Sequence, residues 1–99
     1  MWETHANPLY FTIHSKNILP KMDAYTVPKN ILHQNLQKIE GIEEITCYKK
    51  YQMSITIGKM FNNVEDLARI KQEVNDALAI YFSLPAQLRE EYVGKEYGL

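Results

Sequence analysis

The sequence has few of the residues that crosslink small proteins or hold cofactors. Cys47 is the single cysteine among 99 residues, so no disulfide can form within the chain and a reducing, cytoplasmic location is expected. His5, His14 and His33 share no ligand spacing with one another or with Cys47, whereas zinc sites in small domains show close ligand pairs. We therefore expect no metal ligands and no cofactor.

Further absences narrow the function. The four glycines form no phosphate-binding loop, so nucleotide hydrolysis is not predicted. No apolar run approaches the ~18 residues of a membrane span, and the start has no leader-like apolar segment, so no membrane partner is expected. The net charge of −1 gives no general attraction to phosphate or anionic lipid. Cys47 lies in an apolar phase without a neighbouring base, which predicts a buried, inert thiol and no enzyme.

What remains is ordinary globular composition, with 45% hydrophobic and 23% charged residues. This length matches a common single-domain size and can hold a core without crosslinks. We expect one domain over residues 1–99, with a core at about residues 8–82 and a C-terminal appendage at 83–99.

Alternation of apolar and polar residues predicts four strands, at 9–14, 23–27, 43–50 and 51–60. The first two are expected to pair around a long loop and the last two to form a hairpin. In the last strand the residues expected to face the core are Tyr51, Met53, Ile55 and Ile57. The residues expected on its other face are Gln52, Ser54, Thr56 and Gly58.

Two stretches show helical spacing. The first, 28–40, starts with Pro28 in its first turn, a cap at Thr26 or Val27, and Gly41 as a left-handed residue after its end. The second, 62–82, opens with the capping pair Asn62 and Glu65. Its apolar stripe consists of Val64, Leu67, Ile70, Val74, Ala77, Leu78 and Tyr81 or Phe82.

The ββαββα order predicts an α+β fold. The simplest arrangement is a two-layer sandwich, with two helices on one face of a four-stranded, largely antiparallel sheet and a short C-terminal helical appendage. The other face of the sheet stays open. Its side chains and the adjoining turn give the candidate partner-binding residues Tyr10, Thr12, His14, Tyr48, Lys49, Lys50, Gln52 and Ser54. No catalytic residue is predicted.

This open face suggests a non-enzymatic interaction module, an adaptor, regulator or inhibitor that binds another protein through the face or an edge strand. An alternative is single-stranded nucleic acid, with bases stacked on Tyr10 and Tyr48 beside the two lysines. A further alternative is a subunit that completes an enzyme site through Cys47 or His14. The sequence also leaves a homodimer open, through a patch formed by Tyr81, Leu84, Leu88 and Tyr92.

Three segments carry a resemblance to a known family. The lead-in "ETHANPLYFTI", the helix end "IEGIEEIT" and the strand "QMSITIGK" resemble the small N-terminal domain of Nfu-type iron–sulfur carrier proteins. The resemblance spans residues 3–82 and implies an α+β sandwich with a helper or interaction role. The cluster chemistry of that family belongs to a Cys-x-x-Cys pair in a separate domain, and this chain has one cysteine, so no functional residue is carried over.

Overall fold

The computed structural model describes residues 2–24, 27–28, 30–85 and 87–89. Its elements are β1 (Trp2–Thr4), β2 (Tyr10–His14), α1 (Ile31–Gln37), β3 (Ile42–Lys49), β4 (Gln52–Ile57), the 3₁₀ helix η1 (Lys59–Phe61) and α2 (Val64–Ser83). Residues 87–89 add a short helical piece. The α+β class and the ββαββα order are confirmed.

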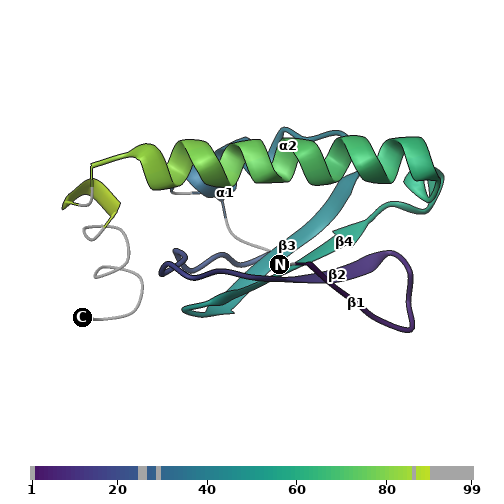
Figure 1. Cartoon of the computed structure of the whole chain (residues 1–99), viewed down its shortest axis with the longest axis horizontal. Helices are drawn as coiled ribbons and strands as arrows, with labels where there is room; N and C mark the ends of the chain where they lie inside the picture. Colours follow the sequence, from purple (N-terminus) through teal and green to yellow (C-terminus); the bar gives the residue numbers. More distant parts are fainter. Residues whose placement is uncertain (1, 25–26, 29, 86, 90–99) are drawn as a thin grey trace.

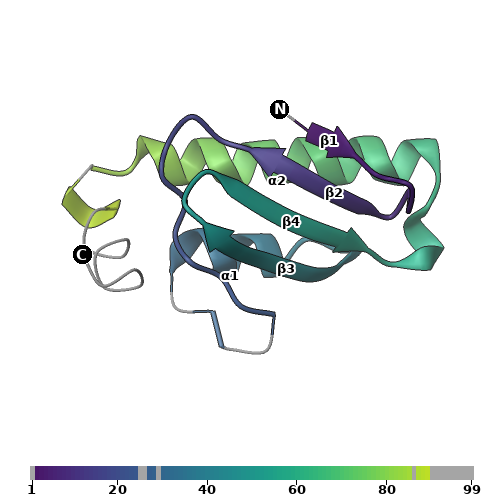
Figure 2. The same ribbon diagram turned by 90° about the horizontal axis from the view of Figure 1, so that it is seen from below.

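The four strands form one antiparallel sheet in the order β1-β2-β4-β3 (Figure 2). β2 and β4 lie in the centre, where Phe11 pairs with Ile55 and Thr12 with Ser54. On the far side of β4, Ile45 pairs with Ile55 and Thr46 with Ser54. Apolar residues therefore align with apolar residues across the strands, and hydroxyl residues with hydroxyl residues.

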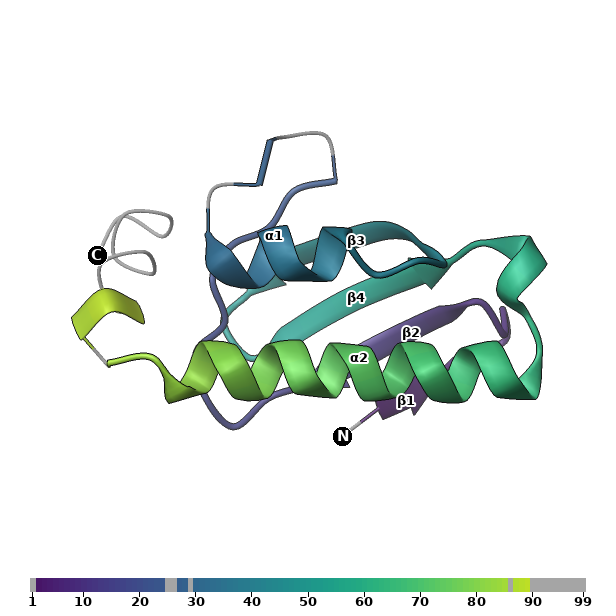
Figure 3. The ribbon, with the colours of Figure 1, turned by 90° about the horizontal axis from the view of Figure 1, so that it is seen from above.

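Both helices cover the same face of this sheet, so the molecule has two layers (Figures 1 and 3). The sheet contributes to the core through Phe11, Ile13, Ile45, Cys47, Met53, Ile55 and Ile57. The helices contribute through Leu32, Leu36, Ile70, Val74, Ala77 and Tyr81. In the described part of the chain, no helix lies on the opposite face of the sheet (Figure 2).

The strand expected at 23–27 is wrong. Asp23, Ala24 and Val27 are in no strand, and Val27 is 79% exposed; the expectation for residues 25 and 26 lies outside the described residues. Met22 makes a single bridge to Cys47, and the prolines on either side, which lack a backbone donor, do not favour a longer ladder.

The neighbour of β2 is instead β1, at the start of the chain. Trp2 anchors this short strand. Its ring meets Phe11 edge to face at a centroid distance of 5.6 Å, and its Nε1 donates to Asn75 Oδ1 in α2 at 3.2 Å. The Lys71 ammonium of α2 lies 5.7 Å from the Trp2 ring centroid. These contacts of Trp2 with β2 and α2 compensate for the few ladder bonds that three residues can make.

Helix α1 begins later than expected. Asn30 is its N-cap and accepts a hydrogen bond from the backbone of His33 at 2.7 Å, so Pro28 and Val27 precede the helix. Its regular part ends at Gln37, and the chain then turns toward β3 through Gly41, which has φ +104° as expected. A Cβ on Gly41 would lie 2.7 Å from Ile70 Cδ1, so the close approach also requires glycine there.

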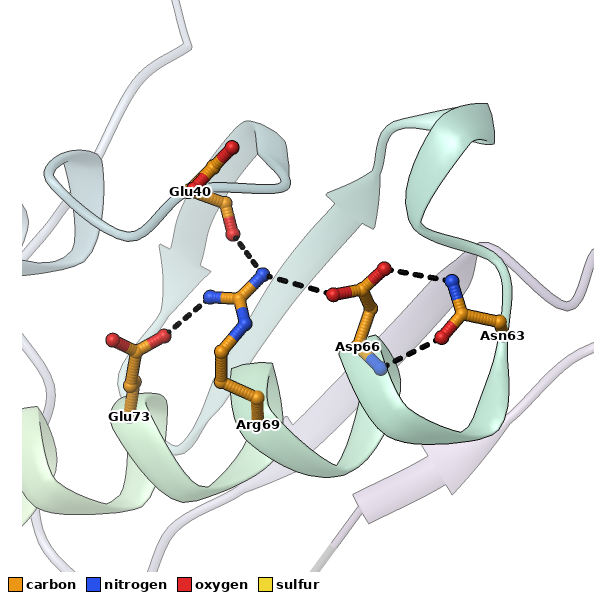
Figure 4. Close-up of polar contacts among 5 residues, drawn as sticks. All are labelled: Glu40, Asn63, Asp66, Arg69 and Glu73. Carbon is orange, nitrogen blue, oxygen red and sulfur yellow. Dashed lines mark hydrogen bonds and ion pairs between the residues drawn. The ribbon is translucent and has the colours of Figure 1, made fainter.

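Helix α2 also starts one residue away from the predicted cap. Asn63 is the N-cap, and its Oδ1 accepts from the Asp66 backbone at 2.9 Å (Figure 4). Val64, expected in the apolar stripe, is 84% exposed. Arg69 joins α2 to the segment after α1 by donating to the Glu40 carbonyl oxygen at 3.0 Å, while an ion pair of 2.6 Å with Glu73 of the same helix holds its guanidinium (Figure 4).

The β3–β4 hairpin corrects the expected position of Tyr51. Lys49 pairs with Gln52, so Tyr51 lies in the turn and is 49% exposed. No described residue other than glycine has positive φ, which excludes the primed turns that match strand twist best. The register shift between Thr46 and Lys49 is a bulge beside this turn, and a bulge increases local twist.

The predicted dimer patch is partly buried. Tyr81 is 0% exposed and packs into the core, whereas Leu88 is 48% exposed; Tyr92 lies outside the described residues. Within the described part of the chain, no helix has the length and apolar character needed to cross a membrane.

Candidate functional site

On the uncovered face of the sheet (Figure 2), the register of the strands aligns polar residues in three cross-strand rows. The pairing places these rows across β2, β4 and β3 in turn: Tyr10, Thr56, Glu44; Thr12, Ser54, Thr46; and His14, Gln52, Lys49. The middle row consists only of hydroxyl residues. An acid stands at one end of the face and a lysine at the other, both on β3.

A hollow of about 260 Å³ opens on this face. It is lined by Tyr10, Thr12, Thr46, Tyr48, Lys49, Gln52 and Ser54. Six of the eight predicted partner-binding residues are therefore brought together, along with Thr46. All of these residues belong to β2, β3 or β4. Side chains alternate along these strands, so the polar ones face the open side because the apolar ones between them face the core.

Hydrogen bonds hold one side of the hollow in place. Tyr10 Oη donates to Ser54 Oγ at 2.9 Å, so the Tyr10 side chain reaches across to β4. His5 meets the Tyr10 ring at a centroid distance of 4.8 Å and shares a hydrogen bond of 2.8 Å between its Nε2 and Thr12 Oγ1. Thr12 is only 9% exposed as a result, although it lies on the open face.

The other two predicted residues lie beside the hollow. His14 Nε2 donates to Glu3 Oε1 at 2.7 Å, which links β2 to β1. This hydrogen bond is the main reason that the pKa of Glu3 falls below its ordinary value. Lys50 lies in the hairpin turn, where its carbonyl oxygen accepts from the Leu19 backbone at 2.7 Å.

Sequence reasoning missed His5 and Glu3, both of which support the face from the start of the chain. A strand of three residues is too short for the alternation of apolar and polar residues to be recognised. Trp2 was the available signal, since a large aromatic residue at the start of a chain gains by packing on the core.

The edges of the sheet are less open than its face. Met22 pairs with Cys47 on the outer edge of β3, where the Met22 backbone donates at 3.0 Å and accepts at 2.8 Å. The opposite edge belongs to β1, which has three residues. A partner strand could therefore not pair with β3 near Cys47, and on the other edge it could pair only with the three residues of β1.

A second hollow, of about 300 Å³, lies between α1 and α2. Two of its acids already have partners: Glu73 binds Arg69, and Asp76 accepts from Gln72 at 2.9 Å. Both of these acids are therefore engaged by side chains of α2 itself.

Cys47 is 1% exposed and packs in the core. Its single S–H has two carbonyl oxygens within hydrogen-bond distance, those of Gln52 at 3.2 Å and Lys49 at 3.3 Å, as expected for a buried structural thiol. Across the described ranges, no group of three or more histidine, cysteine, aspartate and glutamate residues is placed to hold a metal ion.

No family model, curated protein or solved structure matches the chain. The resemblance to the Nfu N-terminal domain therefore stays a prediction, and the candidate site is interpreted from its own geometry.

Proposed function

We propose that this chain is a non-enzymatic interaction module, an adaptor, regulator or inhibitor, that binds another protein on the open face of its sheet. The hollow between Tyr10 and Tyr48 supports this most strongly. Tyrosine is enriched at protein interfaces because its ring gives apolar contact while its hydroxyl keeps a hydrogen-bonding partner. Tyr48 is 57% exposed, so contact with a partner has apolar surface to cover.

The sheet edges support the same choice of surface. Strand addition needs a run of unpaired backbone groups, and Met22 already pairs with Cys47 on the β3 edge, near the hairpin end of the strand. The face is therefore a better candidate than the edge.

Single-stranded nucleic acid fits the face less well. Glu3 and Glu44 stand on the face with the lysines, and acids repel a phosphate backbone. Tyr10 is in contact with His5 on its ring and with Ser54 through its hydroxyl, so it is less available for stacking than an exposed ring.

Photocrosslinking tests this proposal. A benzophenone amino acid in place of Tyr48 keeps an aromatic group on the face, and the same residue in place of Ala68, exposed on α2, is the matched control. In cells of the organism that makes the chain, we expect a discrete protein adduct from position 48, none from position 68, and loss of the adduct when Thr46→Arg fills the hollow.

The other results contradict the proposal. Identical adducts from both positions would mean that the face is not the binding surface. A nuclease-sensitive adduct at position 48 would favour nucleic acid instead. Circular dichroism of each purified variant checks that the fold is kept.

A further inference from the structure

We propose that the hollow on the sheet face is a subsite for one aspartate or glutamate side chain of the partner protein. This inference rests on the proposed function and adds the chemistry that the partner presents. It follows from the charge, the hydrogen-bonding groups and the size of the hollow.

The described lining carries charge of one sign. Lys49 is the only formally charged residue among the seven described residues that line the hollow. It is exposed, and no ion pair within the described residues includes it. A carboxylate of a partner can therefore pair with Lys49 without breaking an existing ion pair.

The remaining lining offers hydrogen-bond donors. Tyr10 already donates to Ser54 Oγ, so the Ser54 hydroxyl proton can point to another acceptor. The Thr46 hydroxyl and the Gln52 side-chain amide make no hydrogen bond with the described residues. Three donors thus surround the space next to Lys49, and hydrogen bonds from such groups to a carboxylate are stronger than those to a neutral acceptor.

The hollow favours a carboxylate over a phosphate. One ammonium group balances the single charge of a carboxylate, whereas a phosphorylated side chain carries about −1.5 to −2 at neutral pH. Glu44 stands on the same strand face as Thr46 and would repel the excess charge. The volume of about 260 Å³ lies below the range of roughly 300–1,000 Å³ of small-molecule pockets, which suits one side chain of a larger partner.

Selection from a displayed library of random extended peptides, with the full chain as bait, tests this. The peptides retained by the wild type should share an acidic residue at one position. For a synthetic peptide from that set, Lys49→Gln should weaken binding by about tenfold, as expected for a charge-assisted hydrogen bond. The matched control Lys59→Gln, an exposed lysine of η1 that does not line the hollow, should change the dissociation constant less than about twofold.

A double-mutant cycle separates contact from general electrostatics. Replacing the peptide acid by its amide should weaken binding to the wild type by about tenfold and leave binding to Lys49→Gln nearly unchanged. Additive effects of the two changes would overturn the subsite. Lys49→Glu should select a basic residue at the same peptide position, and selection of an acidic one would count against it.

The outcomes also separate the subsite from the proposed function. Peptides that need Tyr10 and Tyr48 but show no acidic position would remove the subsite and leave the interaction face in place. Peptides that bind equally well after Tyr10 and Tyr48 are replaced would rule out both the subsite and the interaction face. A phosphorylated peptide or a labelled oligothymidine that binds more tightly than the selected acidic peptide, in a Lys49-dependent way, would overturn the choice of a carboxylate.

Discussion

The two faces of the sheet differ sharply along the same strand. In β4, Met53, Ile55 and Ile57 are 0% exposed under the helices, while Gln52 and Ser54 between them line a hollow on the opposite face. Apolar burial is the main source of stability, so the inner face holds the fold together. The residues of the outer face contribute less to this burial, so they can change at little cost to folding.

The largest expected difference between the inner and the outer face of the sheet is in how much a substitution changes the free energy of unfolding. Ile55→Ala removes a buried side chain that pairs with Phe11 and Ile45 on either side, and should cost about 2–5 kcal/mol. Thr46→Ala, on the outer face, should stay within about 0.5 kcal/mol of the wild type. Urea unfolding of both variants measures this; equal losses would mean that the outer face is also part of a core.

A second prediction concerns how tightly the inner layer is packed. Gly41→Ala should destabilise the fold by roughly 1–3 kcal/mol, because φ +104° disfavours a side chain and its Cβ would press on Ile70. Gly58→Ala is the control, since Gly58 has φ −64° and ordinary contact distances. It should be neutral or stabilise by up to about 1 kcal/mol. Similar destabilisation by both would contradict a special role for Gly41, and thermal or urea unfolding decides.

The smallest effect belongs to the outer face, at the contact between β1 and β2. The hydrogen bond from His14 holds the pKa of the Glu3 carboxyl below its ordinary value in the folded state. A carboxyl group with a lowered pKa stabilises the fold above its unfolded pKa, and this contribution is lost as the pH falls through the folded pKa. Glu3→Gln should therefore be slightly less stable than the wild type at neutral pH, and the difference should disappear in acid.

Unfolding curves at several pH values measure that difference. Glu43→Gln, an exposed acid of β3, is the control and should show no such dependence. A Glu3 effect that is constant with pH would mean that the loss comes from packing and not from the ionised hydrogen bond.

Strands in which apolar and polar residues alternate over several positions were predictable, and so were single residues whose type suits one environment or one backbone conformation. β2, β4, the buried Cys47 and the left-handed Gly41 all follow from patterns within a few neighbouring residues. The caps were less predictable, because adjacent asparagines compete for the same role. Asn63 caps α2 where Asn62 was expected, since only the backbone geometry decides which of them precedes the first helical turn.

The sequence by itself determined the two-layer class, the apolar face of each long strand and the polar phase that became the open face, because the side-chain period of a strand is local. The tertiary structure alone decided that Trp2–Thr4 would pair with β2, that Met22 would cover the β3 edge, and that seven side chains would surround one hollow. Those outcomes depend on contacts between residues distant in sequence, such as Trp2 with Asn75 and Tyr10 with Ser54. No local pattern encodes them, because their free energy appears only when the sheet and helices pack together.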